Sequence, residues 1–437
     1  MDTYFPEVTD KIKYEGRQSN NPLSFKWYDR QQDVMGKSME DHLRFAVAYW
    51  HTFKNDGGDP FGAATMDRDW NKFSDPLDRA RATCDASFEF FSKLDVPYYC
   101  FHDRDIAPEG DNFSESCRNL EKMVNHAAAL QKTTGVKLLW GTANLFSNPR
   151  YAHGAGTNPD FHVFAYAAAQ VKQAISATKE LGGENYVFWG GREGYETLLN
   201  TRLRQEQDQV AAFFHMCVEY AKEIGFNGQF LIEPKPKEPS KHQYDFDTAT
   251  VLNFLQTYEL IDHFKINVEA NHATLAGHTF EHELAVAAAA GKLGSIDVNR
   301  GDLMLGWDTD QFPTDLYSTT YAMLEVLAVG GIGSGGLNFD AKVRRGSHDT
   351  VDLFHGHVGG MDSFARGLVI AAKIIEDGFL EAFRKQRYRS WQLPAAVSVL
   401  TGQSGLSDCE AFVEEHGEPE LKSGRQEYLE NMINNFI

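Results

Sequence analysis

The sequence is poor in cysteine and has no pattern that would build a disulfide framework. The 437 residues include 5 cysteines, an odd number, and no two of them form a C-x-x-C pair. Such cysteines are expected to be reduced, mostly buried thiols in a reducing compartment. They are Cys84, Cys100, Cys117, Cys217 and Cys409.

Targeting segments and long apolar runs are lacking as well. The N-terminus has neither the basic nor the apolar region of a signal peptide. No apolar run approaches the roughly 18–20 residues that cross a bilayer. The longest candidate, residues 284–290, is short and rich in alanine, which is typical of a packed helix. Together with the reduced thiols, these absences predict a cytoplasmic protein.

Basic residues are fewer than acidic residues. The 42 Lys and Arg stand against 62 Asp and Glu, which gives a formal net charge of -20. This charge would repel the phosphates of nucleic acids and of anionic membranes, so we expect neither as a partner. A net negative charge suits a protein that binds cations or neutral solutes. Carboxylates that bind divalent ions add to the formal negative charge, because the formal charge leaves the ions out.

No linker or low-complexity tract divides the chain, and its 42% hydrophobic content is sufficient for a large core. Short strand-like runs alternate with longer helix-prone stretches, which indicates βαβ units closing into an α/β TIM (β/α)8 barrel. The strand-like runs are residues 98–101, 136–140, 186–189, 230–232, 264–268, 294–298 and 337–339, with a first strand within 45–52. Helices are expected at residues 75–93, 117–133, 161–181, 204–224 and 280–292.

Two segments leave alternatives open. Residues 43–53 could equally form a helix, because they lack clean alternation. Residues 379–437 are charged and helix-prone without a further strand, so they form either a helical lid or an arm on another subunit. We divide the chain into a barrel domain with an N-terminal extension, residues 1–378, and a C-terminal helical arm, residues 379–437.

Acidic residues follow the strand-like runs. Strand C-termini meet at one mouth of such a barrel, where active sites lie. A small, partly dry pocket could not hold these carboxylates without counter-charges. Divalent cations such as Mg²⁺, Mn²⁺ or Co²⁺ would neutralise them. More carboxylates than one ion needs suggest two ions with a bridging ligand. The acids are Glu233, Glu269, Asp297, Asp308, Asp310 and Asp340, with His102, Lys235 and His272 nearby.

Each of these residues taken singly also has an ordinary structural explanation. A lone acid at a strand end is more often the N-cap of the next helix. Lys235 could form a plain salt bridge, and His102 with Asp105 an ordinary hydrogen bond. Only the coincidence at matching strand ends favours a functional site.

Other polar residues are assigned structural roles. His278, His282, His355 and His357 are expected to satisfy backbone or solvent contacts, and Glu281 and Glu283 to lie exposed in a first helical turn. The glycine-rich residues 330–336 lack the lysine of a phosphate-binding loop and precede a strand, which favours a tight loop.

Several segments resemble xylose isomerases of the longer, class II type, from about Tyr4 to the C-terminal tail. Long motifs in the same order are far more specific than a lone short pattern. They are CFHDxD at residues 100–105, WGGREG at 189–194, IEPKP at 232–236, NVEANHATLAGH at 267–278 and GWDTDQFP at 306–313.

The resemblance implies two divalent cations per subunit and a role for each site residue. The first cation would be held by Glu233, Glu269, Asp297 and Asp340, and the second by Glu269 as bridge with His272, Asp308 and Asp310. His102, oriented by Asp105, would assist opening of the cyclic sugar, and Lys235 would hydrogen-bond its carbonyl oxygen. Substrate-binding residues would be Trp50, Phe61, Thr142, Phe146 and Trp189, with Phe61 contributed across a subunit contact of a homotetramer. Aromatic rings suit the C–H faces of a sugar, although most aromatics of the chain must belong to the core.

The activity implied is reversible isomerisation of D-xylose to D-xylulose, with D-glucose to D-fructose as a slower reaction. A two-metal-assisted 1,2-hydride shift would follow ring opening, while an enediol route with a side-chain base remains an alternative. Another divalent-metal sugar isomerase or epimerase on the same barrel, or a sugar-binding scaffold without turnover, also remains open. An abasic-site endonuclease would need a basic DNA track, and the acidic balance argues against it.

Overall fold

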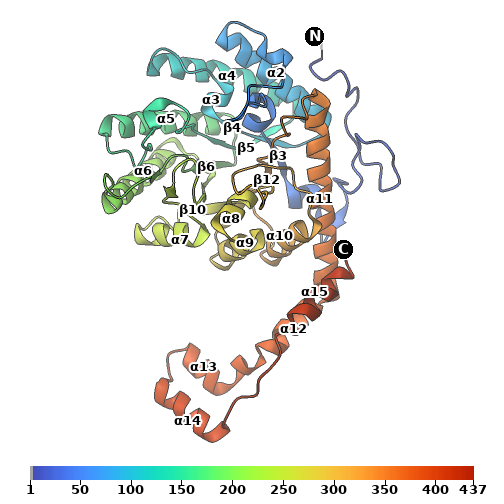
Figure 1. The fold of residues 1–437 in the computed structure, drawn as a ribbon, viewed down its shortest axis with the longest axis vertical. Coiled ribbons are helices and arrows are strands. Elements are labelled where there is room, and N and C mark those ends of the chain that lie inside the picture. Colours follow the sequence, from blue (N-terminus) through green and yellow to red (C-terminus); the bar gives the residue numbers. More distant parts are fainter. Residues whose placement is uncertain (1–2) are drawn as a thin grey trace.

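The computed structural model describes residues 3–437 and closes eight parallel strands into one barrel (Figure 1). The strands follow one another around it in chain order, so their C-terminal ends all open at one mouth. They are β3 (Phe45–Ala48), β4 (Tyr98–His102), β5 (Lys137–Thr142), β6 (Asn185–Trp189), β8 (Gln229–Glu233), β10 (Phe264–Glu269), β11 (Leu293–Asp297) and β12 (Leu337–Phe339). The predicted barrel and all seven strand-like runs are confirmed.

Helices cover the outside of the barrel (Figure 1). The long ones are α2 (Pro76–Leu94), α4 (Phe113–Thr134), α5 (Phe161–Glu180), α6 (Leu203–Ile224), α7 (Thr248–Thr257), α9 (Phe280–Ala289), α10 (Leu316–Ala328) and α11 (Thr350–Asp377). Shorter ones are α1 (Met39–Leu43), α3 (Asp103–Ile106) and α8 (Ala270–Ala276). Helix α4 begins before the predicted residue 117 because the side chain of Asn112 caps it, accepting a hydrogen bond from the Glu115 N–H at 3.0 Å.

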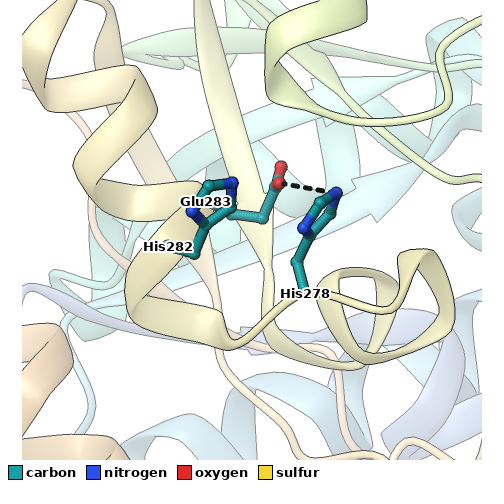
Figure 2. Close-up of side chains that lie close together, drawn as sticks. All are labelled: His278, His282 and Glu283. Atoms are coloured by element: carbon teal, nitrogen blue, oxygen red, sulfur yellow. Dashed lines mark ion pairs between the residues drawn. The ribbon is translucent and has the colours of Figure 1, made fainter.

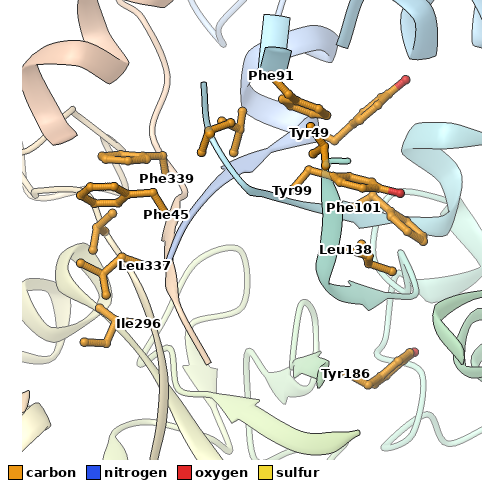
Figure 3. Packing of buried hydrophobic residues seen from close by; sticks show 14 of the residues in the cluster. Phe45, Tyr49, Phe91, Tyr99, Phe101, Leu138, Tyr186, Ile296, Leu337 and Phe339 are labelled. Carbon is orange, nitrogen blue, oxygen red and sulfur yellow. The ribbon is translucent and has the colours of Figure 1, made fainter. Parts of the chain in front are cut away.

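Alternation along the strands sorts the core into two parts. Tyr98 and Cys100 of β4 belong to a small cluster inside the barrel, whereas Tyr99 and Phe101 belong to the larger core between barrel and helices (Figure 3). The ring of Tyr99 stacks on Phe91 of α2 with centroids 5.4 Å apart. Successive residues of one strand thus pack alternately inside the barrel and against the surrounding helices.

The first strand resolves the ambiguity of residues 43–53. Residues 45–48 pair with β12 and β4, and a π-helical turn, Trp50–Lys54, follows directly. The glycine-rich residues 330–336 form the predicted loop before β12. A Cβ atom on Gly335 would lie 1.8 Å from the Gly294 carbonyl oxygen, so steric contact explains this glycine.

Two short antiparallel pairs lie outside the barrel: β1 (Asp33–Val34) with β2 (Lys37–Ser38), and β7 (Gly194–Tyr195) with β9 (His242–Gln243). Within residues 3–437, no helix combines the length and apolar character needed to cross a membrane.

The chain ends in an arm that extends away from the barrel (Figure 1). Its helices are α12 (Phe379–Arg387), α13 (Pro394–Leu400), α14 (Leu406–His416) and α15 (Gln426–Asn434). Helices α12 to α14 have no buried residue, whereas Ile433 of α15 returns to pack on Ile370 and Ile374 of α11. The strandless helical tail is confirmed.

Candidate metal centre and substrate pocket

The barrel brings the predicted acids together at its mouth. Glu233, Glu269 and Asp297 are the last residues of β8, β10 and β11, and Asp340 directly follows β12. Glu269 and Asp297 are paired neighbours in the parallel ladder. Residues far apart in the sequence therefore meet because parallel strands end at the same edge.

Three overlapping groups of side chains could each hold a cation. In each group, one ligand atom per residue lies within 4.8 Å of the others. The groups are Glu233, Glu269 and His272; Glu233, Asp297 and Asp340; and Glu269, Asp308 and Asp310. The seven predicted ligands all belong to this cluster, and two of them, Glu233 and Glu269, each occur in two groups.

Burial and mutual repulsion make this cluster of carboxylates costly unless cations neutralise it. Burial raises the pKa of Glu233 and of Asp297 well above their ordinary values, and neighbouring carboxylates raise both further. Burial likewise raises the pKa of Glu269 to about 7. One oxygen of Asp297, Oδ2, is buried without a hydrogen-bond partner. Such orphaned oxygens facing other carboxylates fit hard divalent cations.

Cationic side chains of the protein neutralise part of the cluster. Lys235 Nζ lies 2.6 Å from Asp308 Oδ2, and Lys342 Nζ 2.8 Å from Asp310 Oδ2. His51 Nε2 lies 2.9 Å from Asp340 Oδ1. Burial lowers the pKa of His51, but Asp340 and Asp310 outweigh this and raise it to about 9.

Asparagine side chains orient the carboxylates from inside the barrel. Asn267 Nδ2 donates to Glu233 at 2.9 Å, and Asn338 Nδ2 donates to Asp297 at 3.1 Å. Asn299 Nδ2 donates to Glu269 at 2.7 Å. These asparagines, His51 and Lys342 were not predicted from the sequence. Such donors hold ligand oxygens in place and are typical of the environment of a metal site.

His102 and Asp105 form the predicted pair at the end of β4. His102 Nδ1 lies 2.8 Å from Asp105 Oδ2, which leaves Nε2 as the other ring nitrogen. Trp50 packs edge-on against the His102 ring with centroids 4.5 Å apart, and Phe146 does so at 5.4 Å. The imidazole is thus fixed by a carboxylate on one side and aromatic rings on two others.

These groups surround one cavity of about 180 Å³. Its walls combine aromatic and charged side chains, as expected for a site that orients a polar ligand and excludes water. Lys235 also lies over the Trp189 ring, 5.2 Å from its centroid. The predicted residues that line the cavity are Trp50, His102, Thr142, Phe146, Trp189, Glu233, Lys235, His272, Asp308, Asp310 and Asp340.

Phe61 lies apart from this cavity. It is 84% exposed on the loop after the π-helical turn, where its ring packs near Trp307 with centroids 6.4 Å apart. It lines a wider depression at the mouth, which Trp50, His51 and Asp308 share with the inner cavity. Within one chain, Phe61 therefore forms part of the entrance rather than of the pocket wall.

The metal-free protein is expected to lose stability as the pH rises from about 4.5 to about 7. The folded state holds a proton on Glu269 that the unfolded state has released, because folding raises the pKa from 4.5 to about 7. This proton contributes fully to the free energy of unfolding below the pKa of the unfolded state. The contribution, roughly 3 kcal/mol, is lost as the pH rises through the pKa of the folded state. Thermal unfolding of chelator-treated wild type and Glu269→Gln across this range measures the loss.

The variant lacks the titrating group, so its stability should depend less on pH. Saturating Mg²⁺ should also flatten the wild-type profile, because a bound cation favours the charged carboxylate. Identical slopes for wild type and variant in chelator would contradict this assignment.

Comparison with known proteins assigns the whole chain to one kind of enzyme. The xylose isomerase of Thermoanaerobacterium thermosaccharolyticum is 58% identical over 437 residues, which spans 100% of this chain and 99% of that protein. The xylose isomerase of Thermotoga maritima is 58% identical, with 100% and 98% covered. Residues 384–437 match the family described as XylA2 C-terminal domain.

A solved structure shares the barrel without close sequence similarity. The D-psicose 3-epimerase of Clostridium cellulolyticum, solved with D-tagatose, has a TM-score of 0.51 and is 9% identical. The similarity covers 74% of this chain and 99% of that one. At this identity the comparison supports the fold alone.

Proposed function

Because this chain belongs to the xylose isomerase family, we propose that it converts D-xylose to D-xylulose reversibly, with D-glucose to D-fructose as a slower reaction. It is an aldose–ketose isomerase, as 58% identity over the full length to xylose isomerases shows. The crowded carboxylates beside an aromatic-walled cavity are the observation in this chain that supports the proposal most directly.

We propose that two divalent cations, Mg²⁺, Mn²⁺ or Co²⁺, occupy the carboxylate cluster. Glu233, Glu269, Asp297 and Asp340 would hold one, and Glu269, His272, Asp308 and Asp310 the other. When bound, such cations act as Lewis acids toward oxygens of the open-chain sugar. The unpartnered oxygen of Asp297 and the raised pKa values support this occupancy.

The protein's own groups would bind and orient the sugar. Lys235 is an ammonium between Asp308 and the Trp189 ring, because Asp308 raises its pKa although burial opposes this. From this place it would donate a hydrogen bond to the carbonyl oxygen. His102 would move the ring-opening proton through Nε2, since Asp105 holds Nδ1. Both proposed roles need side chains that line the cavity, and both residues do.

A hydrogen label at C2 of the sugar distinguishes the two possible routes of isomerisation. We expect C2-deuterated xylose, turned over in ordinary water, to give xylulose that retains the deuterium at C1, because a hydride shift never releases it. The aromatic wall of Trp50, Phe146 and Trp189 favours this outcome by excluding water from the reacting carbons. Mass spectrometry of the product measures retention, and washout of the label to solvent would establish the enediol route instead.

We also propose a cytoplasmic homotetramer in which the arm at residues 379–437 contacts a neighbouring subunit and Phe61 reaches a neighbour's pocket. Large apolar side chains on the arm support this, including Leu400 at 69% and Leu406 at 91% exposure. The cysteines, all free thiols, fit a reducing compartment. Sedimentation of the full chain and of a form ending at residue 378 would test the assembly.

A further inference from the structure

A second group of potential ligands lies beside α8, outside the carboxylate cluster. His278 follows α8 in the turn before α9, and His282 and Glu283 belong to the first turn of α9. Figure 2 shows the three side chains close together, with the His278 ring directed at the Glu283 carboxylate. One ligand atom from each lies within 4.8 Å of the others. Asp247, which caps α7, adds an oxygen 3.3 Å from His278 Nε2.

The two carboxylates are held in similar ways. Asp247 accepts the Thr250 N–H through Oδ1 at 2.7 Å and turns Oδ2 toward His278. Glu283 accepts the Thr248 N–H through Oε2 at 2.8 Å and leaves Oε1 4.0 Å from His278 Nε2. In each case a backbone N–H fixes one oxygen and the other faces the imidazole, as is common for carboxylates that ligate a metal.

One member of this group is buried, whereas the two imidazoles reach solvent. Glu283 is only 4% exposed, so the expectation of an exposed first-turn acid was wrong. Its Oε1 accepts no hydrogen bond from the described residues, and its nearest cationic group is His278, at the limit of an ion pair. The rings of His278 and His282 are stacked with centroids 4.7 Å apart, and the exposed His282 ring can take up a ligand from solvent.

The ligand types point to one class of ion. Imidazole nitrogens favour Zn²⁺ and the later transition metals, whereas all-oxygen sites favour Mg²⁺ or Ca²⁺. Zn–N bonds of about 2.0–2.1 Å place neighbouring ligand atoms of a tetrahedral site roughly 3.3–3.4 Å apart. The distance of 3.3 Å from His278 Nε2 to Asp247 Oδ2 already matches, and 4.0 Å to Glu283 Oε1 requires a small contraction.

We propose that His278, His282 and Glu283, with Asp247 beside them, form a second metal site for a zinc-type transition-metal dication. The ion would tie together the start of α7, the turn after α8 and the first turn of α9. A small cavity bounded by Asp247, Glu269, His272 and Glu283 separates this site from the carboxylate cluster, so the two sites share a wall. Because α8 carries His272 and ends at the turn that holds His278, an ion here would stabilise the helix that supplies a proposed catalytic ligand.

Zinc content after equilibrium dialysis tests the proposal. Wild type, His282→Ala and His278→Gln are dialysed against micromolar Zn²⁺, and bound zinc is counted per chain by elemental analysis. His162→Ala is the matched control, because His162 is also paired with an aspartate but is 95% exposed at the start of α5. Each variant keeps the carboxylate cluster, so the difference from wild type isolates the second site.

We expect both site variants to bind one zinc ion fewer per chain than wild type, and His162→Ala to bind as many. His282→Ala removes no protein hydrogen bond among the described residues, so a folding defect would not account for its loss, and Mg²⁺-supported isomerase activity confirms its fold. Equal zinc content in wild type and both variants would overturn the proposal. That result would leave the isomerase assignment untouched, because the count does not depend on turnover.

Discussion

Glu269→Gln is expected to lower kcat for xylose by at least about a thousandfold, which corresponds to roughly 4 kcal/mol of lost transition-state stabilisation. Glu269 belongs to two of the three groups within the carboxylate cluster that could hold a cation, and the amide would weaken both positions at once. The variant should fold, because the remaining carbonyl can still accept the hydrogen bond that Asn299 donates at 2.7 Å. Initial rates at saturating xylose and Mg²⁺ provide the measurement.

The control for this variant is Glu180→Gln, which makes the same chemical change at an exposed residue ending α5. It should retain wild-type activity. Chelator-treated Glu269→Gln should also unfold at a higher temperature than chelator-treated wild type at neutral pH, because one of several crowded buried carboxylates is gone. More than a tenth of wild-type kcat in Glu269→Gln would contradict a bridging role.

Lys235→Met is expected to lower kcat/KM about 100- to 1000-fold, the usual cost of removing a positioned donor to a developing oxyanion. Methionine keeps much of the side-chain length over Trp189 but removes the ammonium that lines the cavity. The cations should still bind, since Lys235 is not among the proposed ligands. Steady-state kinetics at saturating Mn²⁺ measures the effect.

Lys342→Met is the comparison that shows whether Lys235 acts on the substrate or only neutralises a carboxylate. Lys342 pairs with Asp310 at 2.8 Å, much as Lys235 pairs with Asp308 at 2.6 Å. It faces the outer mouth rather than the inner cavity. We expect a loss below about tenfold, of the size usual for a partly exposed ion pair. Equal losses in the two variants would show that both lysines act only as counter-charges.

The barrel and its acidic mouth could be predicted because the relevant signals are local. Each strand is a short apolar run, and parallel strands must end at one edge, so Glu233, Glu269, Asp297 and Asp340 were bound to meet once the barrel closed. Asp308 and Asp310 were counted among these acids from the sequence, but their assignment to the second cation came from the family resemblance, because they lie in the loop after β11, where no periodicity fixes position.

Some site residues were missed although a signal existed. Asn267 precedes Glu269 by two positions and Asn338 precedes Asp340 by two. Residues two apart on a strand point the same way, so these amides share the barrel interior with the acids, and alternation would have identified them.

Other features depend on tertiary contacts that no single segment encodes. His51 lies in a π-helical turn after β3, where neither strand nor helix periodicity predicts its direction. Glu283 has the sequence context of a solvent-exposed acid, yet the backbone of Thr248 at the start of α7 draws it into the interior. The position of α7 against α9 decides its burial, and this position follows from the closed barrel rather than from neighbouring residues.

If the buried carboxylates at the barrel mouth hold divalent cations, the number of Mn²⁺ ions that the metal-free protein binds should show it. A site with two imidazole ligands favours Zn²⁺ over Mn²⁺, so the number of bound Mn²⁺ ions reports mainly on the oxygen-rich cluster. Titration followed by the paramagnetic resonance of free Mn²⁺ should give two bound ions per chain, with isomerase activity and a higher unfolding temperature appearing as they bind. Full activity in metal-free protein, or an unfolding temperature that Mn²⁺ does not change, would show that the carboxylate cluster is not a metal centre.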